Sequence, residues 1–307
     1  MTVLEAIQKS AEFLDKKGVE SPRLQSELLL AHLLKMPRMK LYLNFERGLA
    51  MAETDALREL IRRRGQREPL QHITGSTSFC GCEIAVNRHV LVPRPETELL
   101  AELGWQLLAE LGWQLLAERR PPARREDINE GDAVPEAGAP TALDFCTGSG
   151  CIAITLAAKC PEASIIATDI SADALAISKE NATRNGASDR IEFVQGDGFA
   201  SLSSSSQFDL IISNPPYIPS AEIATLQPEV RDFDPKVALD GGVDGLDFYR
   251  LIALQAGAFL KPAGKVMVEF GDGQAEAIRN IFGAEKWIVE AVKEDYSQRA
   301  RILVARL

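Results

Sequence analysis

Short apolar runs alternate with segments of helical periodicity from residue 141 to the end of the chain. Helices are expected after the first, second, fourth and fifth of the seven runs that we interpret as strands, which are 142–146, 164–169, 191–194, 208–213, 265–270, 287–292 and 300–305. Crossovers of this length predict an α/β fold, a doubly wound seven-stranded and mostly parallel sheet. The last strand should be antiparallel, because only a short link precedes it.

A different pattern fills the first hundred residues. Helical spacing predicts a first helix after an N-cap at Thr2, and two more over 21–34 and 53–64. Two β-like runs follow, around Ile73 and over 84–92, and they predict a hairpin. We therefore expect a helical substrate-recognition domain (1–72) and a hairpin connector (73–98) before the sheet domain (141–307).

An eight-residue sequence, LAELGWQL, occupies 100–107 and again 108–115. Eight residues leave a helical phase difference of about 80°, so Trp105 and Trp113 are expected on different faces. We interpret the repeat as a local duplication that lengthens one helix. The segment 119–140 has four prolines, nine charged residues and no aromatic one, which is typical of a flexible surface segment. Together they make 99–140 an extended helix with a Pro-rich segment.

Composition excludes several classes of protein. The chain has 307 residues and a net charge of -10, and its first 98 residues carry +2 whereas the remainder carries -12. Because an acidic sheet domain repels phosphate backbones, we expect no tight nucleic-acid binding. The chain lacks a membrane-length apolar stretch and a signal-peptide pattern, so we expect a cytoplasmic monomer. Five cysteines without a Cys-x-x-Cys pair predict reduced thiols and no metal site.

The sequence Asn214-Pro215-Pro216-Tyr217 ends the apolar run 208–213. The Asn214 side-chain oxygen and the Pro215 carbonyl can each accept a hydrogen bond from an NH2 group, and Tyr217 can lie against the plane of that group. The prolines stiffen the backbone that presents these acceptors. The motif predicts a site for a planar nitrogen, although a surface turn after a buried strand uses the same residue types.

A second candidate site follows the first expected strand, where a turn with Gly148 and Gly150 precedes a helix beginning near Cys151. It differs from the dinucleotide fingerprint, which would require glycine where Ala153 stands. Carboxylates occur at three successive strand ends, and a set of this kind suits a positively charged nucleoside without phosphate, S-adenosyl-L-methionine. The alternative is that these acids cap helices or close turns. The expected cofactor residues are Asp144, Cys146, Thr147, Gly148, Ser149, Gly150, Asp169, Asp197, Gly198 and Asn214.

With these motifs in order, residues 141–307 resemble the class I S-adenosylmethionine-dependent methyltransferases. Nearly the whole chain resembles the release factor glutamine methyltransferase family, through 69–75 (PLQHITG), 92–98 (VPRPETE), 214–217 (NPPY) and 237–250 (VALDGGVDGLDFYR). Cys146, where the family usually has glycine, and Gly198, where a bulky residue is common, depart from it.

The resemblance implies methylation of the side-chain amide nitrogen of the glutamine in the Gly-Gly-Gln motif of peptide-chain release factors. It also implies that residues 214–217 are catalytic and contact the substrate together with Arg94 and Glu96. An amide nitrogen is a poor nucleophile, so positioning should matter more than a strong base. Three alternatives remain open: a ribosomal-protein glutamine methyltransferase, an exocyclic-amine methyltransferase of DNA or RNA, and a non-enzymatic adenosine-binding module.

Overall fold

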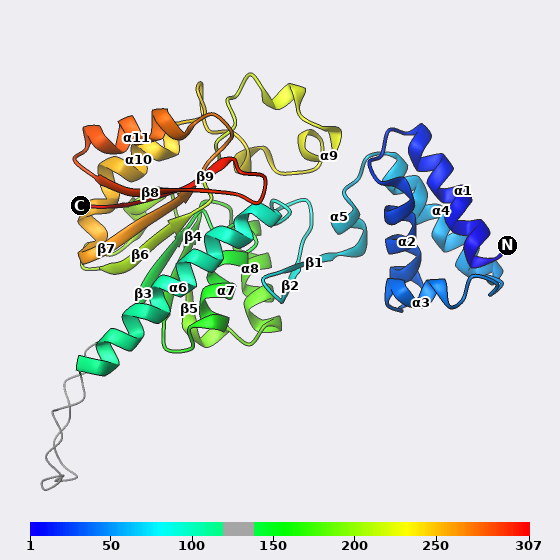
Figure 1. The fold of residues 1–307 in the computed structure, drawn as a ribbon, viewed down its shortest axis with the longest axis horizontal. Helices are drawn as coiled ribbons and strands as arrows, with labels where there is room; N and C mark the ends of the chain where they lie inside the picture. Colours follow the sequence, from blue (N-terminus) through cyan, green and yellow to red (C-terminus); the bar gives the residue numbers. More distant parts are fainter. Residues whose placement is uncertain (119–137) are drawn as a thin grey trace, which may run out of the picture.

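The computed structural model describes residues 1–118 and 138–307, without the side chains of 113–118. A seven-stranded sheet has the order β5-β4-β3-β6-β7-β9-β8 (Figure 1). Strand β9 runs antiparallel to the other six strands of this sheet, which confirms the predicted doubly wound sheet with an antiparallel last strand. The strands are β3 (Thr141–Phe145), β4 (Ser164–Asp169), β5 (Ile191–Gln195), β6 (Phe208–Ser213), β7 (Leu260–Glu269), β8 (Ile288–Glu294) and β9 (Ala300–Arg306).

Helices cover both faces of this sheet, each over its own apolar core. One core is shared with α6 (Pro95–Glu118), α7 (Cys151–Lys159) and α8 (Ala172–Arg184), and the other with α10 (Asp247–Gln255) and α11 (Ala275–Ala284). All residues of α7 from Cys151 to Ala157 are buried, as expected for a helix that packs on a parallel sheet beneath a neighbouring helix. The two helical layers hold the sheet so that the carboxyl ends of β3, β4 and β6 lie at one edge of it.

A separate helical region precedes the sheet and has an apolar core of its own. A capping box begins its first helix, because Thr2 accepts from the Glu5 amide while Glu5 accepts from that of Thr2. Its helices are α1 (Val3–Lys16), α2 (Pro22–Leu33), α3 (Arg38–Tyr42), α4 (Met51–Gly65) and α5 (Leu70–Thr74). The predicted β-like run around Ile73 is wrong, since Ile73 is the buried residue of α5.

The hairpin consists of β1 (Ser76–Phe79) and β2 (Cys82–Ala85) and is shorter than predicted. The run 84–92 leaves the strand after Ala85, yet Val86 and Val90 stay in the sheet domain's core. The Asn181 side chain of α8 also pairs with both backbone groups of Ala85, at 2.7 and 3.0 Å. The hairpin thus packs on the sheet domain and leads into it from the helical region.

Both copies of the eight-residue repeat lie in the single helix α6. Gly104 of the first copy lies against β6 and α7, where an added Cβ would come within 2.7 Å of the Ile212 side chain. The side chain of Trp113 and the segment 119–137, which the sequence analysis expected to be flexible, lie outside the described residues.

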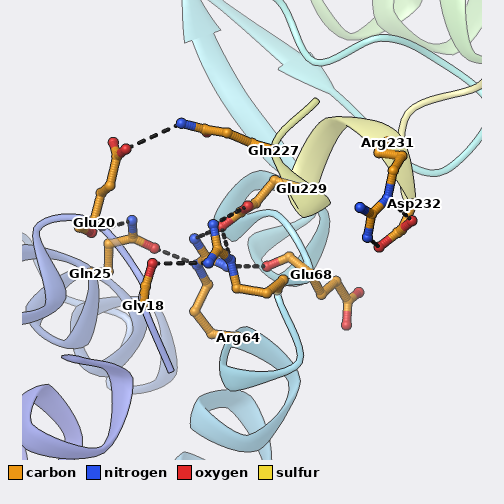
Figure 2. A network of polar contacts seen from close by, with 10 residues as sticks. Gly18, Glu20, Gln25, Arg64, Glu68, Gln227, Glu229, Arg231 and Asp232 are labelled. Carbon is orange, nitrogen blue, oxygen red and sulfur yellow. Dashed lines mark hydrogen bonds and ion pairs between the residues drawn. The ribbon is translucent and has the colours of Figure 1, made fainter. Parts of the chain in front are cut away.

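The helical region also meets the chain that follows β6. There the short helix α9 (Pro228–Arg231) presents Glu229 to two arginines of the helical region (Figure 2). Arg67 donates to both Glu229 oxygens at 2.6 and 2.7 Å, and Arg64 donates to one at 2.7 Å. Arg64 is almost fully buried, so this carboxylate compensates a charge that has little water around it.

Within the described ranges, no helix combines the length and apolar character needed to cross a bilayer. All five cysteines are free thiols. The described residues also contain no cluster of metal-ligating side chains.

Candidate active site

A cavity opens at the carboxyl edge of the sheet, where β3, β4, β5 and β6 end. Its wall brings together residues from three expected groups: the glycine turn, the acidic strand ends and the Asn-Pro-Pro-Tyr motif. The sequence-predicted residues on this wall are Arg94, Cys146, Thr147, Gly148, Ser149, Asp169, Asp197, Gly198, Asn214 and Pro216. Such convergence follows from the topology, because parallel strands deliver their ends to one edge.

The turn after β3 brings the backbone to the cavity. Gly148 has φ +57°, and a Cβ placed there would meet nothing within 4 Å, so the open space faces the cavity. Cys146 adopts φ +62° without being glycine, a conformation that disfavours a side chain. This is one of the two positions at which the sequence departs from the family pattern, and the backbone there is left-handed.

Asp144 holds this turn from behind. It is fully buried, and its Oδ2 accepts from the Thr147 hydroxyl at 2.6 Å and from the Ala153 amide at 3.1 Å. Burial raises the pKa of Asp144 to about 7, opposed by these two hydrogen bonds. Asp144 does not line the cavity, so we assign it to shaping the turn instead of contacting a ligand.

Asp169 ends β4 and faces the cavity. Its Oδ2 accepts from the Gly148 amide and its Oδ1 from the Ser171 amide, each at 2.9 Å. Burial raises the pKa of Asp169, while these backbone hydrogen bonds act in the opposite direction. Each oxygen retains accepting capacity, so the carboxylate can take two further donors such as the hydroxyls of a ribose. Ile170, which is half exposed, lies next to it on the wall.

Asn214 lines the cavity at the end of β6. Its Nδ2 donates to the Thr97 hydroxyl oxygen at 3.0 Å. Among the described residues no donor is found for its Oδ1, so the side-chain oxygen is the group that a ligand NH2 can use. The arrangement is therefore suited to holding a planar amide or amine.

The other members of the motif lie differently. Pro216 is on the wall, whereas Pro215 is buried behind it. Tyr217 packs against the core beneath α10 and α11, and burial raises its pKa to about 12 with help from the nearby Glu269. Tyr217 thus does not face the cavity as the sequence analysis expected. Gly150 and Glu96 are also absent from the wall.

The chain after the motif covers the cavity on the side of the helical region. Pro235, Val237 and Ala238 line the wall, with Phe248 from α10. Arg94 is anchored to this segment by a 2.7 Å ion pair with the buried Asp234. Burial raises the pKa of Asp234 to about 6, and the Arg94 charge opposes that rise.

Sequence reasoning missed Thr97, the partner of Asn214, and Glu269, which lies next to both. Thr97 belongs to the segment 92–98, where only Arg94 and Glu96 were assigned to the site. The position of Thr97 in that segment was the feature of the sequence that could have identified it as a site residue. Glu269 ends a buried strand as Asp144 and Asp169 do, but it carried no motif.

Comparisons with known proteins agree with this architecture. A family model described as PrmC N-terminal domain matches residues 5–75, and another described as Methyltransferase small domain matches residues 132–227. Among solved structures, the hMettl16 catalytic domain in complex with MAT2A 3'UTR hairpin 6 has a TM-score of 0.50 at 16% identity, over 73% of this chain and 75% of that one. At that identity the likeness concerns the fold alone.

Two relatives are much more similar in sequence. The release factor glutamine methyltransferase of Geobacter sulfurreducens is 42% identical over 281 residues, 92% of this chain and 88% of its own length. That of Chlorobaculum tepidum is 40% identical over 304 residues, 98% of this chain and 95% of its own length. The chain therefore belongs to the release factor glutamine methyltransferase family.

Proposed function

We propose that this protein transfers a methyl group from S-adenosyl-L-methionine to the side-chain amide nitrogen of the glutamine in the Gly-Gly-Gln motif of peptide-chain release factors. Family membership supports the reaction class. The observation that carries the proposal is Asn214, whose Nδ2 is held by Thr97 while its Oδ1 faces no protein donor in the described part of the chain. A primary amide is a ligand whose NH2 such an oxygen binds.

The residues present fit the proposed cofactor. Asp169 offers two acceptor oxygens, the Gly148 turn allows close approach of the backbone, and α7 begins beside it. Asp197 at the end of β5 is exposed on the same wall and can accept from an exocyclic amine. When bound, S-adenosylmethionine supplies an electrophilic methyl group on a sulfonium.

The protein's own contribution is orientation. Asn214 Oδ1 would hold the glutamine NH2, so that the nitrogen is directed at the methyl donor. Positioning of reactants can lower a barrier by about 7 to 11 kcal/mol. The nitrogen gains positive charge as the N–C bond forms and the S–C bond breaks, and the acceptor oxygen stabilises that charge. The amide then loses one proton to water.

We further propose that residues 1–72 recognise the protein substrate and that the enzyme acts as a cytoplasmic monomer in translation termination. The separate core of the helical region and its anchoring to the chain that covers the cavity support the recognition role.

The test offers labelled S-adenosylmethionine to the purified protein with four acceptors in parallel: a release factor, ribosomal proteins, DNA and RNA. Labelling of the release factor, lost when the Gly-Gly-Gln glutamine is replaced by alanine, is the expected result. Preferred labelling of ribosomal protein or nucleic acid would contradict the proposed substrate.

A further inference from the structure

Glu269 is a buried carboxylate beside the candidate active site, and the proposed reaction does not use it directly. Strands β6 and β7 run parallel with Ser213 opposite Val268, so the next residues, Asn214 and Glu269, end neighbouring strands at the same edge. Glu269 is 1% exposed, and its Oε2 has no hydrogen-bond partner among the described residues. A buried acid with incomplete pairing is unfavourable for stability, which points to a role other than folding.

Thr97 connects this carboxylate to the motif. It is 3% exposed at the start of α6, and its oxygen accepts from Asn214 Nδ2 at 3.0 Å. The side chains of Thr97 and Asn214 both lie close enough to Glu269 to lower its pKa as hydrogen-bonding groups. A threonine hydroxyl has one proton to donate, and an ionised carboxylate can only accept. An ionised Glu269 therefore favours donors on its side, namely the Thr97 hydroxyl and the Asn214 NH2 group, and the Thr97 oxygen is left to accept from that NH2 group.

The placement of donors and acceptors among Glu269, Thr97 and Asn214 determines which end of the Asn214 carboxamide faces the ligand. A flipped carboxamide would turn its oxygen toward the Glu269 carboxylate, which can only accept when ionised. It would also present an NH2 group to the substrate NH2, and two donors repel each other. We propose that Glu269 and the Thr97 hydroxyl together fix the Asn214 carboxamide with Oδ1 directed at the acceptor nitrogen. Both are positioning residues, and the inference rests on the proposed role of Asn214.

The charge state of Glu269 makes this arrangement of hydrogen bonds around Asn214 dependent on pH. Burial raises the pKa of Glu269 to about 7. Hydrogen bonding by Thr97 and Asn214 and the charge of Arg301 on β9 oppose this rise, and Glu96 on α6 reinforces it. Besides burial, the Glu269 charge in turn raises the pKa of Tyr217, Tyr249 and Cys151, while the Arg94 charge lowers that of Tyr217. Because only the ionised acid is restricted to accepting, protonation below about pH 7 should release the carboxamide and slow the transfer.

The experiment measures single-turnover methylation by the full-length enzyme, using the acceptor that the wild type methylates. Thr97→Val removes the hydroxyl with little change of shape, and loss of a neutral hydrogen bond should slow the reaction about tenfold. Thr97→Ser keeps the hydroxyl and should retain most of the rate. Thr155→Val, which removes a buried hydroxyl bonded within α7, is the matched control. Cofactor affinity should stay unchanged in all three.

Two further readouts separate positioning from a merely structural role. In an Asn214→Ala background, Thr97→Val should have no additional effect, because Thr97 would act only through Asn214. Glu269→Gln keeps an acceptor oxygen but cannot titrate, so it should abolish the loss of rate below pH 7. Three results would each overturn the inference. The first is a wild-type rate in Thr97→Val, and the second is a further tenfold loss of rate when Thr97→Val is added to Asn214→Ala. The third is a Glu269→Gln enzyme whose rate still falls below pH 7 as that of the wild type does. Because the comparison uses whichever acceptor is methylated, an error in the proposed substrate would be seen separately.

Discussion

Asp169 is the residue on which cofactor binding should depend most. Its two oxygens accept one backbone amide each and still face the cavity. Hydrogen bonds to a charged group contribute about 1.5–3 kcal/mol each, and two ribose hydroxyls are expected here. Asp169→Ala should therefore weaken S-adenosylmethionine binding at least tenfold.

Calorimetry on the purified variant measures this affinity. Asp189→Ala, which removes an exposed acid just before β5 at the far edge of the sheet, is the control and should bind normally. An Asp169→Ala protein with wild-type affinity would remove this carboxylate from the cofactor site.

Individual site residues differed in how well the sequence predicted them. Asp169 and Asn214 could be placed at one edge because each follows a recognisable strand, and the topology of a parallel sheet makes such ends converge. Thr97 could not, since its contact with Asn214 spans 117 positions of the chain. Asp144 and Tyr217 show the opposite error: they stand in the right motifs, but their side chains turn into the core.

The two copies of the repeat in α6 have the same sequence and different surroundings. A Cβ on Gly104 would approach the Ile212 side chain at 2.7 Å within the packed core, whereas one on Gly112 would meet the flexible Glu162 side chain at 3.2 Å. The phase difference of about 80° over eight residues explains why equivalent positions face different neighbours.

Alanine at these two glycines should therefore have opposite effects on the free energy of unfolding. Gly104→Ala should destabilise by about 1–3 kcal/mol through overpacking. Gly112→Ala should stabilise by up to about 1 kcal/mol, because alanine favours a helix and Glu162 can move. Chemical denaturation of the two variants compares them directly, and equal shifts of the same sign would contradict the packing described for α6.

Short elements were the least predictable part of the fold. The apolar residues near Ile73 fit a strand or a helix equally well over five positions. The structure forms α5, which begins after Pro69 and ends at Gly75 with φ +84°. The long helices and central strands were predicted well, because their periodicity extends over enough residues to distinguish one period from the other.

At the scale of the molecule, Glu229 joins the helical region to the chain that covers the cavity. Burial disfavours its charged form, yet hydrogen bonds from Arg67 and Arg64 outweigh this effect and lower its pKa. A lowered pKa means that the stabilisation is present above the unfolded-state pKa and is lost as pH falls through the folded-state value.

Glu229→Ala should cost about 3 kcal/mol of unfolding free energy near neutral pH, because Arg64 stays buried without its partner. The loss relative to wild type should shrink in acid. Asp55→Ala, which breaks an exposed pair with Arg58, is the control and should change stability by less than about 1 kcal/mol. Denaturation at pH 7 and pH 4 makes the comparison, and a Glu229 effect as small as that of the control would show that the two parts are not held together here.

The hairpin determines where the chain can be divided. Phe79, Ile84, Val86 and Val90 belong to the sheet domain's core, so a protein beginning at Leu91 should unfold. One beginning at Ser76 should keep cofactor binding and lose methylation of the intact protein substrate. Calorimetry and a methylation assay on residues 76–307 test this division, and full activity without the helical region would contradict its recognition role.

The central claim is that Asn214 holds the glutamine amide of a release factor. The most direct test is single-turnover methylation of a release factor by the wild type and by Asn214→Ala, with a Gly-Gly-Gln glutamine→Ala release factor as the blank. Loss of one positioned partner should slow the transfer on the order of 10²-fold, with cofactor affinity nearly unchanged and the blank unlabelled. Equal rates for the two enzymes, or labelling of the blank, would show that the acceptor atom is a different one.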